Sequence, residues 1–158
     1  MEKLFSKIYI GADSAGFQLK EQLIAHLTSQ GYEVADCGAY NEESSHYPEF
    51  AKLVCQSVKD DKSAVGILVC GTGIGMSIAA NKHRGIRAAV CGDTFSARMT
   101  RLHNNANILC IGARVIGFGL AADIVDLFVS TPFESGGRHA LRVGMIDEIE
   151  AGEYNCKA

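Results

Sequence analysis

The sequence predicts an α/β fold in which a five-stranded parallel sheet lies between two layers of helices and is followed by a C-terminal helix. Short apolar runs alternate with longer stretches of helical periodicity along the chain, which is typical of strand–helix–strand units with right-handed crossovers. Three of those runs are almost continuously apolar, as expected for strands covered on both faces. With only two prolines and no low-complexity linker, residues 1–158 are expected to form one domain.

The first part of the chain supplies two strands and two helices. Lys7–Asp13 is largely apolar up to a terminal glycine and aspartate, so a strand is expected there. Gly16–Gln30 carries apolar residues at helical spacing and is followed by a glycine that would end a helix. Tyr32–Cys37 is a weaker strand, and the polar segment Asn41–Pro48 is expected to be a loop. Apolar residues share one face of Phe50–Val58, which predicts a helix.

Three strong strands follow, separated by helices. The strands are the apolar segments Ala64–Cys70, Ile86–Cys91 and Asn107–Ile111. The helices are expected at Ile74–Lys82, Thr94–Asn104, Phe118–Val129 and about His139–Glu150. Ligands of such sheets bind outside the carboxyl ends of the strands, so the residues directly after each strand are the candidates for a site.

The composition argues against several classes of protein. Lysine and arginine total 15 while aspartate and glutamate total 18, and the resulting net charge of −3 argues against nucleic acid as the main partner. No apolar run approaches the roughly 20 residues of a membrane span, and the N-terminus lacks the features of a signal peptide. A cytoplasmic protein with reduced cysteines is therefore expected, since no CxxC pair occurs. The histidines show no HxH or HxxxH spacing, so no metal site is predicted.

Glycines crowd the turn after the third strand. Gly71, Gly73 and Gly75 lie between an apolar strand and a helix, where backbone N–H groups and the helix dipole favour an anion. The spacing matches neither the dinucleotide fingerprint nor a P-loop. Cys70 stands at the edge of this turn, either as a reactive thiol or simply as the last buried residue of the strand. Asp13, after the first strand, is expected either to meet a ligand or to cap the next helix.

Histidine and arginine side chains supply a second set of candidates. His103 is suited to general acid or base chemistry near neutral pH, or alternatively to capping the end of its helix. Arg138 and Arg142 are four residues apart and would share one helical face, where two guanidinium groups suit a phosphate. Because the chain is acidic overall, this grouping beside glycine turns favours an anionic ligand over a solvated charged face.

Together these motifs resemble the ribose-5-phosphate isomerase type B family, which also includes galactose-6-phosphate isomerase subunits and allose-6-phosphate isomerase. The matching segments follow the family's order over about residues 8 to 145. They are Gly11–Phe17, Tyr47-Pro48, Cys70–Lys82, Gly85–Ala89, His103–Asn107, Gly112–Gly117 and Gly137–Val143. The resemblance implies a three-layer Rossmann-like fold with strand order 2-1-3-4-5. It also implies an aldose–ketose isomerase of the pentose phosphate pathway that uses no metal or organic cofactor.

The resemblance gives each candidate residue a role. Cys70 matches the base that moves a proton between C1 and C2 through a cis-enediolate. His103 matches the residue that opens the furanose ring, with Asp13 on the other side of the sugar. Further residues match groups that bind the enediolate oxygens, the ring and the phosphate. The enediolate set is Gly71, Thr72, Gly73, Gly75 and Asn104, Tyr47 lies near the ring, and the phosphate set is Arg114, Arg138 and Arg142.

The family forms dimers in which both chains build each site, so a homodimer is expected here, with further pairing of dimers left open. One residue departs from the family's pattern. Where the family usually has a histidine after the aspartate, this chain has Ser14, which forms hydrogen bonds but carries no charge at neutral pH. His139 or a water molecule could take over the task of that histidine.

Ser14 leaves the identity of the phosphorylated sugar open. Ribose 5-phosphate is the leading substrate, and allose 6-phosphate, galactose 6-phosphate or a tetrose phosphate are alternatives with the same chemistry. A non-catalytic flavodoxin-like binding module is a remote alternative from another class. A receiver module of that kind needs an acidic cluster and a lysine after the fifth strand, whereas Asp13 has no acidic neighbour and Arg114 follows that strand.

Overall fold

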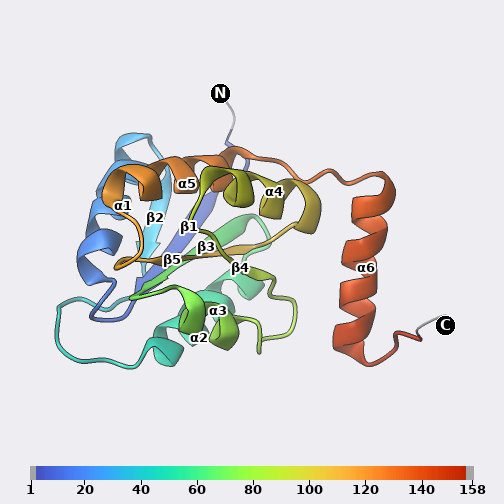
Figure 1. The fold of residues 1–158 in the computed structure, drawn as a ribbon, viewed down its shortest axis with the longest axis horizontal. Helices are drawn as coiled ribbons and strands as arrows, with labels where there is room; N and C mark the ends of the chain where they lie inside the picture. The colour runs from blue at the N-terminus through green and yellow to red at the C-terminus, as the bar shows by residue number, and fades with distance from the viewer. Residues whose placement is uncertain (1–2, 156–158) are drawn as a thin grey trace.

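The computed structural model describes residues 3–155, which contain five strands and six helices (Figure 1). The strands are β1 (Lys7–Ala12), β2 (Glu33–Asp36), β3 (Ala64–Cys70), β4 (Ala88–Val90) and β5 (Ile108–Gly112). The helices are α1 (Phe17–Ser29), α2 (Tyr47–Asp60), α3 (Ile74–Ala80), α4 (Thr94–Asn104), α5 (Phe118–Ser130) and α6 (Gly137–Ala151). All of these elements were expected from the apolar pattern, which confirms the α/β class.

Two helices begin earlier than their apolar residues indicate. α2 starts at Tyr47 rather than Phe50, because a proline is tolerated in the first turn of a helix and Pro48 stands there. The expected polar loop therefore ends one residue before Tyr47, and this places the tyrosine on a helix. α6 starts at Gly137, whose positive φ of 68° suits glycine.

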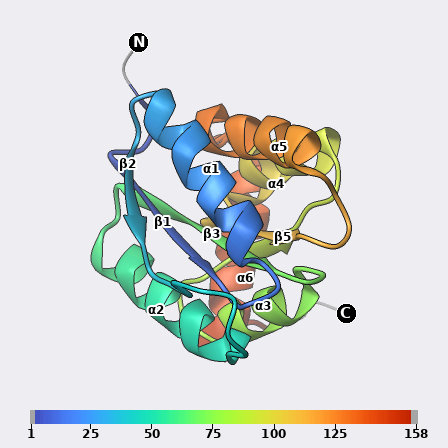
Figure 2. The same ribbon diagram turned by 90° about the vertical axis from the view of Figure 1, so that its left-hand side faces the viewer.

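The sheet is entirely parallel, with the order β2-β1-β3-β5-β4. Helices α1, α4 and α5 lie on one face, and α2 and α3 lie on the other (Figures 1 and 2). Each face has its own apolar core. The first packs Ile10, Ile67 and Leu109 against α1 and α5, and the second packs Leu68 and Cys110 against α2 and α3.

The expected strand order 2-1-3-4-5 is wrong in its last two strands, because β5 lies between β3 and β4. The burial of the two strands gives the reason. All five residues of β5 are buried, whereas β4 has three residues and its Val90 is 42% exposed, so β4 suits an edge. The exchange also moves α4 to the face of α1 and α5, since a right-handed crossover that runs back across the sheet must use the opposite face.

Helix α1 contains a fully buried lysine. Lys20 Nζ is 2.6 Å from Asp36 Oδ2 and 2.9 Å from Glu21 Oε1, and its side chain has no exposed area. The other oxygen of Asp36 accepts a hydrogen bond from the Gly38 N–H at 2.9 Å. The ion pair therefore ties α1 to the end of β2 and to the loop that leads towards α2, and it supplies the partner that a buried ammonium group requires.

Helix α6 stands apart from the two helical layers, beside α4 (Figure 1). Val143 is its only buried residue. No helix within residues 3–155 combines the length and the apolar character needed to cross a membrane. The five cysteines in this range are free, and Cys156 lies outside it.

Candidate active site

The glycine turn after β3 folds back onto the thiol of Cys70. Cys70 is the last residue of β3 and is only 5% exposed, and its Sγ accepts a hydrogen bond from the Gly73 N–H at 3.1 Å. Thr72 Oγ1 accepts one from the Ile74 N–H at 3.3 Å. Cys70 is thus a buried end-of-strand residue, and its sulfur is also held by the backbone amide of Gly73, the N-cap of α3.

The end of β5 forms one wall beside this turn. Gly112 is the register partner of Cys70, and a Cβ added to it would lie 2.7 Å from the Thr72 carbonyl oxygen. The Arg114 N–H donates to the Gly71 carbonyl at 3.0 Å. The side chain of Arg114 lies over Gly71, because a Cβ built there would be 3.6 Å from Arg114 Cδ and Nη1. A guanidinium group therefore borders the glycine turn.

The end of β1 forms the opposite wall. The Asp13 N–H donates to the Val69 carbonyl at 3.2 Å, next to Cys70. Asp13 Oδ1 accepts a hydrogen bond from the Gly16 N–H at 3.0 Å, just before α1. The carboxylate thus stabilises the turn that enters the helix and borders the candidate site. The capping interpretation of Asp13 is wrong, because the N-cap of α1 is Gly16 and no side chain caps this helix. The Ser14 N–H donates to Ser45 Oγ at 3.1 Å, and the sequence alone offered no signal for this contact.

Tyr47 closes a third side from α2. A Cβ added to Gly75 would lie 2.8 Å from Cζ of the Tyr47 ring, so the ring packs directly on the first turn of α3. Nine of the predicted site residues therefore surround the thiol or its turn. They are Asp13, Ser14, Tyr47, Cys70, Gly71, Thr72, Gly73, Gly75 and Arg114.

The remaining four predicted residues form a second group around the end of α4 and the start of α6. They are His103, Asn104, Arg138 and Arg142. The His103 ring stacks on that of His139, with centroids 4.0 Å apart and planes 5° apart. His139 Nε2 lies 3.7 Å from Glu134 Oε2. Burial, followed by the charge of His103, lowers the pKa of His139 despite the opposing charge of Glu134.

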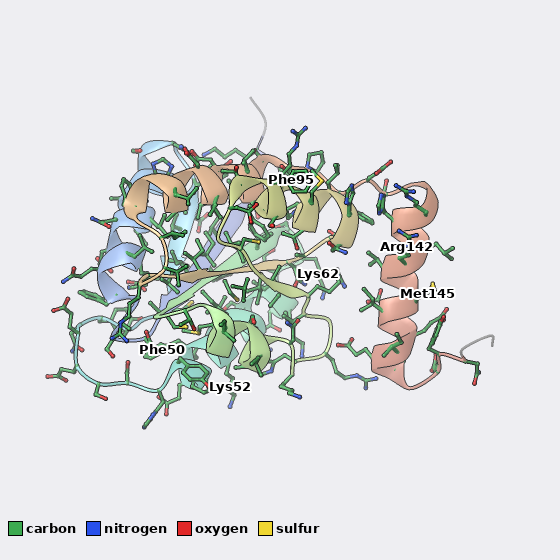
Figure 3. All side chains as sticks on the ribbon, viewed as in Figure 1. Phe50, Lys52, Lys62, Phe95, Arg142 and Met145 are labelled. Carbon is green, nitrogen blue, oxygen red and sulfur yellow. The ribbon has the colours of Figure 1, made fainter. Side chains whose placement is uncertain are left out.

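The two groups lie at opposite ends of the sheet. β5 begins at Ile108, shortly after His103, and ends at Gly112 beside Cys70. A parallel strand rises about 3.3 Å per residue, so these two ends are roughly 13 Å apart before the loops are added. Figure 3 places Arg142 on α6 across the molecule from Phe50 on α2. A single chain therefore does not bring its candidate base and its candidate ring-opening histidine together.

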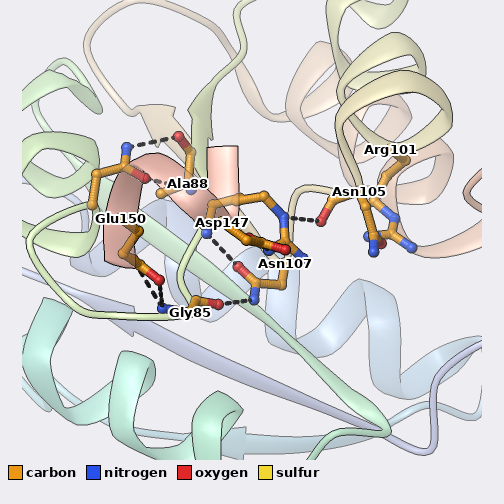
Figure 4. Close-up of polar contacts among 9 residues, drawn as sticks. Gly85, Ala88, Arg101, Asn105, Asn107, Asp147 and Glu150 are labelled. Carbon is orange, nitrogen blue, oxygen red and sulfur yellow. Dashed lines mark hydrogen bonds and ion pairs between the residues drawn. The ribbon is translucent and has the colours of Figure 1, made fainter. Parts of the chain in front are cut away.

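Polar contacts fix the distal end of α6 against the loop before β4 (Figure 4). Both carboxylate oxygens of Glu150 accept hydrogen bonds from the Gly85 N–H, at 3.0 and 2.9 Å. Arg87 Nη1 lies 3.3 Å from Asp147 Oδ1, and Arg87 Nε donates to the Asn105 carbonyl at 3.1 Å. Because Asn105 directly follows α4, these contacts place α6 relative to the end of α4. They thereby hold α6, which carries Arg138 and Arg142, against the end of α4.

The other thiols within residues 3–155 are poor candidates for chemistry. Burial raises the pKa of Cys55 to about 12 and that of Cys91 to about 11. Burial also raises the pKa of Cys37, and that of Cys110 is raised well above its usual range. Each of them is therefore a protonated thiol at neutral pH. Cys70 is distinguished by its position at the glycine turn.

Replacing Gly73 with alanine is expected to destabilise the protein by at least about 1 kcal/mol, because an L-residue is penalised in the left-handed region. Gly73 has φ of 78°, and an added Cβ would lie 3.0 Å from the Ile111 carbonyl carbon. Urea unfolding measures the change. Gly117→Ala is the matched control, since Gly117 has φ of −82° and open space around an added Cβ. Equal unfolding midpoints for the two variants would contradict the proposed strain at the turn.

Two of the side chains around the second group were missed by the sequence analysis. Glu134 was not considered, and His139 entered only as a substitute for the histidine that Ser14 replaces. No spacing rule could have revealed them, because His103 and His139 are brought together by the packing of α6 against α4.

Known proteins resemble this chain over nearly its whole length. The family described as Ribose/Galactose Isomerase matches residues 8–146. Ribose-5-phosphate isomerase B of Escherichia coli strain K12 is 47% identical over 144 residues, which cover 91% of this chain and 96% of the relative. D-erythrulose-4-phosphate isomerase of Pectobacterium atrosepticum is 47% identical over 132 residues, with coverages of 82% and 86%.

Solved structures agree with the sequence comparisons. Ribose-5-phosphate isomerase B of Clostridium thermocellum is 51% identical and has a TM-score of 0.90, covering 94% of this chain and 99% of its own. A ribose 5-phosphate isomerase from Thermotoga maritima is 55% identical, with a TM-score of 0.87 and coverages of 90% and 98%.

Proposed function

The chain belongs to the Ribose/Galactose Isomerase family, and from this premise we propose that it interconverts ribose 5-phosphate and ribulose 5-phosphate with Cys70 as the base. The observation that carries the proposal is the thiol at the end of β3, enclosed by the glycine turn, Asp13 and Arg114. We further propose that the enzyme acts in the cytoplasm as a homodimer.

The proton transfer follows from the position of the sulfur. Cys70 Sγ takes the proton from C2 of the open-chain aldose, and the electrons form the C1–C2 double bond with negative charge on O1. A proton moves from O2 to O1, and Sγ returns its proton to C1 to give the ketose. Amide groups of the turn after Cys70 stabilise the enediolate, since donors already oriented towards the developing charge need no reorganisation.

The other residues around the glycine turn would bind the sugar and its phosphate. Asp13 and Tyr47 border the sugar, while Ser14 and Arg114 lie beside the turn and suit contacts to the sugar and its phosphate. The phosphate contributes no chemistry, but its binding energy positions the reacting carbons.

The separation of the two residue groups supports a site built by two chains. We propose that His103 of the partner subunit opens the furanose ring and that Asn104 of the partner subunit assists the enediolate. The partner's Arg138 and the partner's Arg142 would join Arg114 at the phosphate. Apolar side chains on α6 support a contact between chains, because Leu141 is 68% and Ile149 60% exposed. Covering such side chains with a second copy would remove them from water.

A panel of phosphorylated sugars tests the proposal. Ribose 5-phosphate is expected to be converted with the highest kcat/KM, ahead of erythrose 4-phosphate, allose 6-phosphate and galactose 6-phosphate. A chelator is expected to leave this activity intact. No turnover of any of these sugars by a folded protein would contradict the isomerase function.

A tetrose phosphate is the second candidate substrate. Ser14 stands where the family usually has histidine, and the relative from Pectobacterium atrosepticum is a D-erythrulose-4-phosphate isomerase. If erythrose 4-phosphate is turned over faster than ribose 5-phosphate, the enzyme is an isomerase of the same mechanism whose substrate is the tetrose phosphate. Ser14→His should then shift the preference back towards ribose 5-phosphate.

A further inference from the structure

Three potential metal-binding side chains from three segments of the chain converge beside the end of α4. They are His103 in the last turn of α4, Glu134 in the loop after α5 and His139 in the first turn of α6. One donor atom from each side chain lies within 4.8 Å of the other two. Because the three ligands come from separate segments, this convergence is a product of the tertiary fold.

The backbone holds these side chains close to one another. The Glu134 N–H donates to the Leu102 carbonyl at 3.0 Å, which anchors the glutamate beside the residue that precedes His103. The stacked rings bring His139 against His103. The side chain of His139 is 12% exposed and that of Glu134 is 55% exposed. One ligand is therefore well packed, while the carboxylate retains the freedom to adjust around an ion.

We propose that His103, Glu134 and His139 bind a divalent transition-metal ion such as Zn²⁺, and that the bound ion withdraws His103 from catalysis. The inhibitory part rests on the proposed function, whereas the binding part does not. Two imidazoles and one carboxylate form the donor set of zinc sites that keep a fourth position open. Imidazole nitrogen favours zinc, copper and nickel, whereas magnesium and calcium prefer oxygen ligands.

Ion binding requires the donor atoms to approach one another and the ring stack to open. Bonds of about 2.0–2.2 Å in a tetrahedral site place the donor atoms about 3.4 Å apart, so the three donors must approach by on the order of 1 Å. Because an imidazole lone pair lies in the ring plane and the planes of His103 and His139 are 5° apart, one ring must rotate to another rotamer before both nitrogens point at one ion. Arg138 and Arg142 lie on the same helix as His139 and repel a cation, so binding in the micromolar range is expected rather than tighter binding.

Binding can be measured with Co²⁺ alone as a spectroscopic probe. The Cys70→Ala background removes the site thiol, and the absorption spectrum of bound Co²⁺ separates nitrogen and oxygen ligands from thiolate through the near-ultraviolet sulfur charge-transfer band. We expect one equivalent of Co²⁺ to bind without that band. Glu134→Gln and His139→Gln should each weaken binding by at least about tenfold, since each removes one of three protein ligands. His46→Gln, at an exposed histidine before α2, is the matched control and should not change the affinity.

Two outcomes would overturn the site. Equal Co²⁺ affinity in the Glu134→Gln, His139→Gln and parent proteins would show that these side chains are not ligands. A spectrum dominated by the sulfur charge-transfer band would place the ion on another cysteine. Circular dichroism of each variant checks the fold, and Glu134 is exposed enough for its substitution to leave the fold intact.

The inhibitory part has its own measurement. Zn²⁺ is expected to lower the isomerase activity of the unmodified protein, and a chelator should restore it. Glu134→Gln should retain the basal activity and require at least about tenfold more Zn²⁺ for the same inhibition. Unchanged zinc sensitivity in Glu134→Gln would overturn this part. If the protein isomerises no sugar phosphate, the proposed function fails, and the Co²⁺ spectra still decide whether the site exists.

Discussion

Cys70→Ala is expected to lower the rate of ribose 5-phosphate isomerisation by roughly 10²–10⁴-fold, the share that a positioned acid–base group contributes. A methyl group cannot take the C2 proton, whereas the glycine turn, Arg114 and the strand ends remain in place. The thiol is 5% exposed and accepts only one hydrogen bond, from the Gly73 N–H, so the variant should fold. The initial rate of ketose formation measures the effect.

A second readout tests the proton transfer itself. In deuterated water the thiol formed at Cys70 should exchange its proton with solvent before C1 is protonated, so the unmodified enzyme should introduce deuterium at C1 of the ketose, detected by NMR. Cys70→Ala should introduce almost none. Cys37→Ala is the matched control, because it removes a half-buried cysteine away from the turn and should retain activity. If Cys70→Ala isomerises the sugar at the parent rate with its fold intact, another residue is the base.

Mixing two inactive variants is expected to restore about a quarter of the activity of the unmodified protein. Cys70→Ala and His103→Gln are unfolded together in equal amounts and refolded, so that half of the dimers formed are mixed. Each mixed dimer then has one site with both native residues and one site with neither. Half of the dimers are mixed and half of the sites in each mixed dimer are active, so about a quarter of all sites are active.

Cys70 and His103 lie at opposite ends of one sheet, so each site of a dimer would take one of them from each chain. If one chain supplied both residues of a site, no combination of subunits would create an intact pair, and the refolded mixture would remain as inactive as its components. Mixing Cys70→Ala with Thr72→Ala is the control. Both substitutions then lie in the part of the site that one chain supplies, so a mixed dimer contains no site with all of its native residues. The refolded mixture should show only the low activity that Thr72→Ala has by itself.

The architecture was predictable wherever a local pattern decides the structure. Continuous apolar runs identified β3 and β5, which are buried on both faces. The similar run at Ile86–Cys91 also predicted a doubly covered strand, but β4 is a short, partly exposed edge strand. The glycines after Cys70 identified the turn, because glycine readily adopts the backbone conformations that a tight turn needs. The order of β4 and β5 was not accessible, because it depends on which strand tolerates the exposed edge, a property of the assembled sheet.

The site was predictable in its parts and not in its assembly. The chemistry of Cys70 and His103 could be proposed from residue type and family resemblance. That they lie at opposite ends of one chain required the topology, because the direction of α4 across the sheet determines where His103 ends. The grouping of Glu134 and His139 with His103 could not be predicted, since their proximity depends on how α6 packs.

The shortness of the two outermost strands limits how copies of this protein can associate. β2 has four residues and β4 has three, so neither edge offers a long row of free backbone groups. Long open edges are what allow sheets of different molecules to join and aggregate. A sheet continuous across two subunits is therefore disfavoured, and specific association is left to side chains on helices. Partner recognition can therefore change by surface substitution on the helices without disturbing the sheet.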